Sequence, residues 1–372
     1  EPGGDGAETL ESGSRAAAHG GFTTVCTMPN TDPPLDRPEL VAELLDRATA
    51  AACRVRVLAA ATRGREGQEA SDIRSLASLI VGVSDDGASI PTADVARDVM
   101  RALREVDLPL VEHAEDPTIA DGSVMRAGLL ASRLGLAGWP PEAELSIVER
   151  DLALAEATGA RLHLTHLSTA GSVDAVRRAR ERGVAVTCDV TPHHLALTED
   201  WVAGSRRFVW EDPEPNLQAA YDGRCRVNPP LPSRDDALAL LAALDDGSVD
   251  AIATDHAPHP AQRKLVPFDE AAPGLIGLET ALSIGLAAVD AGRLRLSRLL
   301  AALSTRPAAV IGERRALSDG AEADLVLFDP AARWRVERDA LASASVNTPL
   351  LGMDLPGVVR LTVAAGRVTY RS

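Results

Sequence analysis

A chain of 372 residues with 45% hydrophobic and 25% charged residues is long enough for one large barrel or two ordinary domains. Its net charge of −16 argues against nucleic acid or an anionic membrane surface as a partner, because both attract cationic surfaces. No apolar run approaches the roughly 18 residues of a membrane span. The four cysteines are scattered, with no Cys-x-x-Cys pair, so we expect a cytoplasmic protein without disulfides.

One rhythm recurs along the chain: an apolar or β-branched run ends in polar residues, and a segment with helical spacing follows. Seven runs of this kind read as strands, at 21–30, 54–62, 78–86, 108–116, 160–168, 184–194 and 249–259. Helical patterns lie between them at 38–52, 92–105, 142–157, 172–182 and 234–244. This alternation predicts an α/β fold with a parallel sheet covered by helices. A (β/α)8 barrel, one strand short, is favoured over a doubly wound open sheet.

The chain changes character after the last of these strands. A Gly/Pro-bearing loop at 266–280, called the lid below, is long enough to cover a site, and a helical stretch to about 312 follows. Strands are then predicted at 323–330 and 333–337, with a hairpin over 357–372 that turns around 364–366. We therefore expect a barrel domain over 1–315 and a small C-terminal β element over 316–372.

Polar residues gather where the predicted strands end. Reactive residues of (β/α)8 barrels collect at the carboxyl ends of the strands. Six of the eight histidines lie at four such ends, whereas a lone histidine is more often a hydrogen-bonded structural residue. Their shared position predicts a metal centre. The strand-end residues are Asn30, Asp85, Asp86, His113, His166, His193, His194, Asp255, His256 and His259.

Nine motifs spread over the whole chain resemble the bacterial class I dihydroorotases of the amidohydrolase superfamily. They are EPGG, GGFTTVCTMPNT, SDDG, HAED, THLST, TPHHL, VNPPL, ATDHAPH and GLIGLET. The resemblance implies a TIM-type barrel of the metal-dependent hydrolase kind and a zinc-dependent cyclic amidohydrolase. Such an enzyme interconverts N-carbamoyl-L-aspartate and (S)-dihydroorotate in pyrimidine biosynthesis. It also implies a homo-oligomer, or a complex with aspartate transcarbamoylase.

The resemblance implies roles for individual residues. Asp86 corresponds to the carboxylate that bridges two zinc ions, and Asp255 to the general acid/base that serves a metal-bound hydroxide. His193, His194 and His256 are expected to make structural hydrogen bonds, and His163 to pack within a strand. By position, the metal ligands are Asp86, His113, His166 and Asp255, and the substrate-binding positions are Asn30, Asn228, His259 and the backbone of Pro273 and Gly274.

The chain's only lysine bears on the nearest alternatives. Hydantoinase, dihydropyrimidinase and allantoinase usually bridge their metals with a carboxylated lysine, but Lys264 lies beyond the last barrel strand, in the lid region. The usual form of these enzymes is therefore excluded, and their Asp-bridged variants are the remaining enzymatic alternative. A non-catalytic paralogue that serves as a structural partner of a transcarbamoylase is the alternative from another class, which the intact motifs disfavour.

One feature of the family pattern is absent from this sequence. In the family a His-x-His pair and an arginine directly precede EPGG, and this chain begins at Glu1. We therefore expect the first metal to have too few ligands, with at most one metal bound tightly per chain and little dihydroorotase activity. We also expect unpaired edge strands beside the gap. A chain restored upstream should recover a second metal and turnover.

Overall fold

The computed structural model describes residue 3, residues 6–314 and residues 316–372. Most of the EPGG motif and the domain boundary expected at 315 lie outside the described residues. No helix in the described residues has the length and apolar character needed to cross a membrane.

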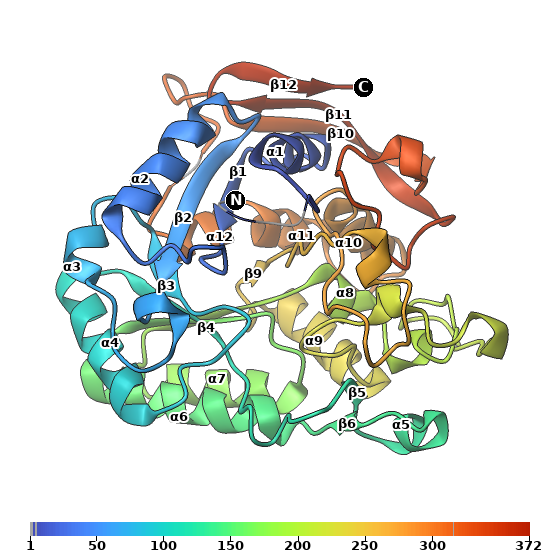
Figure 1. The fold of residues 1–372 in the computed structure, drawn as a ribbon. Helices are drawn as coiled ribbons and strands as arrows, with labels where there is room; N and C mark the ends of the chain where they lie inside the picture. The colour runs from blue at the N-terminus through green and yellow to red at the C-terminus, as the bar shows by residue number, and fades with distance from the viewer. Residues whose placement is uncertain (1–2, 4–5, 315) are drawn as a thin grey trace.

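In the described part of the chain, seven parallel strands form the central sheet, in the order β1-β2-β3-β4-β7-β8-β9. Each lies within a run predicted from the sequence, and the sheet curls as a TIM-type barrel with helices outside it (Figure 1). The predicted fold class is therefore confirmed. The strands are β1 (Thr24–Thr27), β2 (Arg54–Ala60), β3 (Gly82–Ser84), β4 (Pro109–His113), β7 (Arg161–Thr165), β8 (Val186–Val190) and β9 (Ala251–Ile252).

The predicted helices lie between the strands and cover the outside of the sheet. They are α2 (Pro38–Arg47), α4 (Ala93–Val106), α6 (Glu142–Thr158), α7 (Ala170–Glu181) and α9 (Arg234–Asp246). Helix α4 shows why they form: Thr92 caps its first turn by accepting from Val95 N. Its buried residues Ala96, Val99, Met100 and Leu103 repeat at helical spacing, so one face packs on the sheet.

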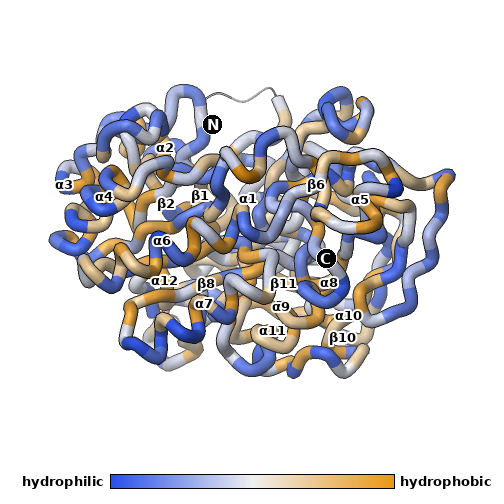
Figure 2. The backbone as a smooth tube through the Cα atoms, turned by 90° about the horizontal axis from the view of Figure 1, so that it is seen from below, coloured by the Kyte–Doolittle hydropathy of each residue, from blue (hydrophilic) through white to orange (hydrophobic). Residues whose placement is uncertain are grey.

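Shorter elements were not predicted individually. Figure 2 shows hydrophobic and hydrophilic segments alternating along the chain, which is typical of elements that bury one face. These elements are α1 (Leu10–His19), α3 (Ile73–Leu76), β5 (Met125–Arg126), α5 (Leu129–Leu134), β6 (Gly138–Trp139), α8 (Pro192–Ala196), α10 (Ala281–Asp290), α11 (Leu296–Leu303) and α12 (Thr305–Val310).

A three-stranded antiparallel sheet follows the barrel, made of β10 (Leu325–Arg335), β11 (Asp354–Ala364) and β12 (Arg367–Arg371). The prediction of two strands at 323–330 and 333–337 was wrong, because β10 continues through a register irregularity between Asp329 and Arg333. The predicted hairpin is confirmed, with Ala365 and Gly366 both in the left-handed region. The sheet lies beside α1 (Figure 1), where Thr362 Oγ1 donates to Ala18 O at 2.7 Å.

Candidate metal centre and active site

Three side chains meet at the carboxyl ends of barrel strands: Asp86 after β3, His113 at the end of β4 and His166 after β7. One ligand atom of each lies within 4.8 Å of the other two. His113 Nδ1 is 2.9 Å from His166 Nε2. Asp86 Oδ1 is 3.6 Å from His166 Nε2 and 3.9 Å from His113 Nδ1. Parallel strands therefore bring together residues that are far apart in the sequence.

This donor set fits a zinc ion. Ligand atoms at about 2.0–2.1 Å from a tetrahedral zinc lie roughly 3.3 Å from each other, and the three measured separations span that value. Two imidazole nitrogens 2.9 Å apart need a proton or a cation between them, because two lone pairs would repel. Imidazole and carboxylate are also ligands that zinc prefers. Asp86, His113 and His166 would hold the ion.

The three side chains shift one another's pKa values. Burial opposes charge on His166, but the hydrogen bond to Asp86 and the nearby carboxylates raise its pKa to about 9. Burial and the adjacent charge of His166 lower the pKa of His113 to about 4. Burial of Asp86 is outweighed by both histidines and Arg65, so its pKa is lowered. The ionised carboxylate of Asp86 therefore lies beside a protonated His166, and a metal ion bound here would replace that proton.

The backbone is strained where two of the candidate residues stand. His166 has φ 43° and Asp255 has φ 45°, in the left-handed region that costs a non-glycine residue about 1–3 kcal/mol. At His166 the turn is held by Asp189 of β8, whose Oδ1 accepts from His166 N at 2.7 Å. Asp189 also accepts from His163 Nε2 at 2.8 Å and Thr165 Oγ1 at 3.0 Å. A carboxylate on the next strand thus orients a candidate ligand.

Asp255 follows β9 and lies outside the trio whose ligand atoms are within 4.8 Å of each other. It is still within the electrostatic reach of that trio. Burial raises the pKa of Asp255 to about 7, against the charge of His166 and with support from Asp86 and Asp189. A carboxyl group with a pKa near 7 can both accept and release a proton at neutral pH, which suits general acid–base chemistry.

Two asparagines border the metal candidates. Asn30 Nδ2 donates to Asp86 Oδ2 at 3.1 Å. Asn228 Nδ2 lies 3.5 Å from His113 Nε2 and donates to Glu115 Oε1 at 3.3 Å. The other oxygen of Glu115 accepts from Trp139 Nε1 at 2.8 Å. Both predicted substrate-binding asparagines therefore lie at the site, and Glu115 holds Asn228 in place.

His259 and the lid contact each other. His259 Nε2 donates to Pro273 O at 2.8 Å, and Gly274 N donates to Arg226 O at 2.9 Å. Burial lowers the pKa of His259, so its imidazole is neutral at neutral pH. The loop after β9 and the lid therefore form one connected surface that contains the remaining predicted substrate-binding positions.

The other histidines differ from one another in their contacts. His194 Nε2 donates to Pro229 O at 3.0 Å, and His256 Nδ1 accepts from Gly277 N at 3.2 Å, so the expected structural hydrogen bonds are present. For His193 that expectation was wrong, because neither ring nitrogen has a hydrogen-bond partner among the described residues. His163 does more than pack, since it also bonds Thr187 Oγ1 at 2.7 Å.

Some residues around the site had no assigned role in the sequence. Arg65 Nη2 donates to the backbone carbonyls of Asp85 and Asp86, and buried Asp85 accepts from Thr62 rather than joining the trio. Asp189 could have been noticed, because an acid within the apolar run VAVTCDV requires buried partners. Arg65 gives no comparable signal, since its contacts are to backbone atoms.

A family model and the curated relatives of this chain agree on one family. A family model described as dihydro-orotase-like matches residues 1–172. A curated dihydroorotase of Pelobacter propionicus is 41% identical over 374 residues, which cover 100% of this chain and 84% of that protein. A dihydroorotase of Anaeromyxobacter dehalogenans is 44% identical, covering 100% of this chain and 83% of the relative.

Solved structures share the fold at lower identity. The L-hydantoinase (dihydropyrimidinase) of Arthrobacter aurescens superposes with a TM-score of 0.82 at 24% identity, covering 97% of this chain and 80% of that one. A dihydropyrimidinase of Brevibacillus agri gives a TM-score of 0.81 at 20% identity, covering 98% and 80%. At these identities the likeness is one of fold.

Proposed function

This chain belongs to the dihydroorotase family, and on that premise we propose that it interconverts N-carbamoyl-L-aspartate and (S)-dihydroorotate with zinc at Asp86, His113 and His166. One observation carries the proposal. These three side chains converge in a chain that aligns over its whole length with curated dihydroorotases at 38–44% identity. A non-catalytic paralogue would have no need to keep the convergent ligand set.

The chemistry divides between the ion and the protein. Bound zinc supplies Lewis acidity, which polarises the scissile carbonyl and lowers the pKa of water to about 7. Asp255 accepts the proton of the attacking water and returns it to the ring nitrogen as the amide bond breaks. Its pKa of about 7 supports that role, because both of its protonation states are then populated at neutral pH. In ring closure the proton moves in the opposite direction.

Three polar side chains would orient the substrate. The amides of Asn30 and Asn228 border the metal candidates and can hydrogen-bond the ring. His259 would meet the substrate carboxylate, whose charge would raise the imidazole pKa and favour a charge-assisted hydrogen bond. The lid backbone at Pro273 and Gly274 would close beside His259, which its carbonyl already contacts.

An Asp-bridged hydantoinase is the alternative that shares this fold. The chain's only lysine, Lys264, follows a 3₁₀ helix at Ala261–Arg263 and lies on no barrel strand. A lysine bridge is therefore excluded, and the substrate decides between the remaining enzymes. Whole-length identity to dihydroorotases near 40% favours dihydroorotate over hydantoins.

Substrate comparison tests the proposal. The zinc-loaded complete gene product should hydrolyse dihydroorotate with a kcat/KM at least about 100-fold above those for dihydrouracil and hydantoin. A site built to bind a carboxylate leaves buried polar groups unpaired when that group is missing. Equal or higher kcat/KM on hydantoin would instead assign the chain to the alternative.

A further inference from the structure

The lone lysine of the chain is buried at the base of the lid. Lys264 is 3% exposed, and its Nζ donates to three backbone carbonyls: Arg226 O at 3.0 Å, Ala272 O at 2.6 Å and Gly274 O at 2.9 Å. Two of these carbonyls belong to the lid, and the third belongs to the stretch that leads to Asn228. A single ammonium therefore ties the lid to the segment that carries a predicted substrate-binding residue.

Burying this cation is costly. Burial lowers the pKa of Lys264 to about 7, which shows that the charged form is penalised. An ammonium has three N–H donors, and each of them has a carbonyl acceptor here. An apolar side chain would fill the same space but leave three carbonyls without this donor. Backbone anchoring, rather than space filling, accounts for a lysine at this position.

Asn347 holds the same carbonyl from the other side. Its Nδ2 donates to Gly274 O at 3.2 Å and to Ala257 O at 2.8 Å, and its Oδ1 accepts from His259 N at 3.1 Å. Asn347 is 3% exposed. One side-chain amide thus joins the lid to the loop that carries His259.

The contact between the two loops leaves no spare space. Gly274 has φ 126°, and a Cβ added there would lie 2.6 Å from Ala257 Cβ and 3.1 Å from His259 Nε2. Only glycine permits this approach. The lid backbone therefore packs directly on the loop after β9, and its position determines where His259 stands.

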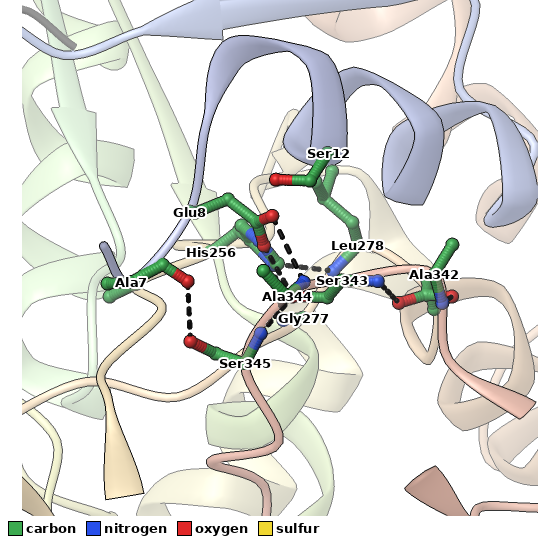
Figure 3. Close-up of polar contacts among 12 residues, drawn as sticks. Ala7, Glu8, Ser12, His256, Gly277, Leu278, Ala342, Ser343, Ala344 and Ser345 are labelled. Carbon is green, nitrogen blue, oxygen red and sulfur yellow. Dashed lines mark hydrogen bonds and ion pairs between the residues drawn. The ribbon is translucent and has the colours of Figure 1, made fainter. Parts of the chain in front are cut away.

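The segment that carries Asn347 is itself anchored beside the candidate acid/base. Glu8 accepts from Ser343 Oγ, from Ala344 N at 3.1 Å and from His256 Nε2 at 3.4 Å (Figure 3). Ser345 Oγ also donates to Ala7 O at 2.7 Å. Glu8 therefore links this segment to His256, the residue that follows Asp255. Asn347 links the segment to Ala257 and His259 of the same loop.

We propose that Lys264 and Asn347 are positioning residues that fix Pro273, Gly274 and His259 in the geometry that receives the substrate. This inference rests on the proposed function, because it treats the lid and His259 as substrate-binding groups. Both side chains act through backbone carbonyls and a backbone amide, and neither needs to touch the substrate. Their loss should therefore weaken substrate binding more than it slows chemistry.

The test compares Lys264→Met and Asn347→Ser with Gln262→Ala, an exposed control on the 3₁₀ helix that directly precedes Lys264. Steady-state kinetics with dihydroorotate, zinc content and backbone hydrogen exchange are measured on the complete gene product. We expect KM to rise about 10-fold or more in both variants, because buried carbonyls that lose their donor are left unpaired and no longer hold the lid and His259 in place. We expect kcat to change by less than about 3-fold, with unchanged zinc content.

Backbone hydrogen exchange and a double-mutant cycle distinguish a positioning role of the two residues from a general loss of stability. Amides of 272–277 and 255–259 should exchange faster in both variants and not in Gln262→Ala. In a His259→Ala background, Lys264→Met should raise KM by a smaller factor than it does in the unaltered protein, because the effects of coupled residues are not additive. If Lys264→Met does not fold, the same cycle is run with Asn347→Ser. A lowered Tm with unchanged KM, or additive effects, would overturn the proposal.

Failure of the proposed function gives a different result. If the unaltered protein turned over no dihydroorotate, the function assigned above would be wrong, and the substrate role of the two residues with it. The exchange data would then still show whether the two side chains hold the lid. Normal turnover in the unaltered protein, together with unchanged exchange and KM in both variants, would overturn the positioning role alone.

Discussion

Replacing Asp86 with alanine should remove the anionic member of the candidate zinc site. Its Oδ1 lies 3.6 Å from His166 Nε2 and 3.9 Å from His113 Nδ1, so the carboxylate supplies the third candidate ligand atom. Removing a group that merely orients a ligand costs about 10–100-fold in metal affinity. Loss of a ligand itself should exceed that, so we expect zinc affinity to fall by more than about 100-fold, with turnover falling in parallel.

Asp85→Asn is the matched control for this change. Asp85 is the adjacent carboxylate and is buried, but it bonds Thr62 and takes no part in the trio. The amide oxygen of asparagine can keep the bond from Thr62 N, and its amide nitrogen can donate to Thr62 Oγ1 in place of accepting from it, at a cost of about 1 kcal/mol in stability. Zinc affinity is measured by competition with a chromogenic chelator. Affinity within a few fold of the unaltered protein in Asp86→Ala, or an equal loss in Asp85→Asn, would refute the assignment.

Other perturbations test separate parts of the site. In steady-state kinetics, Asp255→Asn should lower kcat by about 100-fold or more with a smaller change in KM, because the amide cannot shuttle the proton. A kcat within a few fold of the unaltered protein would assign the proton shuttle to another group. His259→Ala should weaken binding of dihydroorotate more than of dihydrouracil, and equal losses would show that His259 does not sense the carboxylate. Burial raises the pKa of Glu8, but hydrogen bonds led by that from His256 outweigh it and hold the pKa at about 2, below its ordinary 4.5. Its stabilisation should therefore be complete above pH 4.5 and be lost as the pH falls towards 2. Glu8→Gln should flatten this dependence in thermal unfolding, and an unchanged slope would contradict it.

The barrel and its metal candidates were accessible from the sequence because their signals are local. Each strand is a short apolar run, and the polar residues at its carboxyl end follow directly in the sequence. Parallel strands then place those ends at one face, which is why Asp86, His113 and His166 fall within one set of strand-end residues. Their selection from that set as metal ligands rests on the family resemblance, and the structure brings the three together.

The misses have a different origin. The predicted strands at 323–330 and 333–337 leave residues 331–332 between them, yet pairing with β11 resumes at Arg333 within one strand. His193 was expected to find a hydrogen bond, and its surroundings offer none among the described residues. Lys264 and Asn347 contact backbone carbonyls of distant segments, which no side-chain pattern reports.

Dihydroorotate turnover before and after metal removal tests the central claim most directly. The complete gene product is assayed as purified, after dialysis against a chelator, and after zinc is restored. Activity should be lost on dialysis and return with zinc, because bound zinc would supply the Lewis acidity that activates water and polarises the scissile carbonyl. Turnover that persists in protein shown to be free of metal would contradict the account.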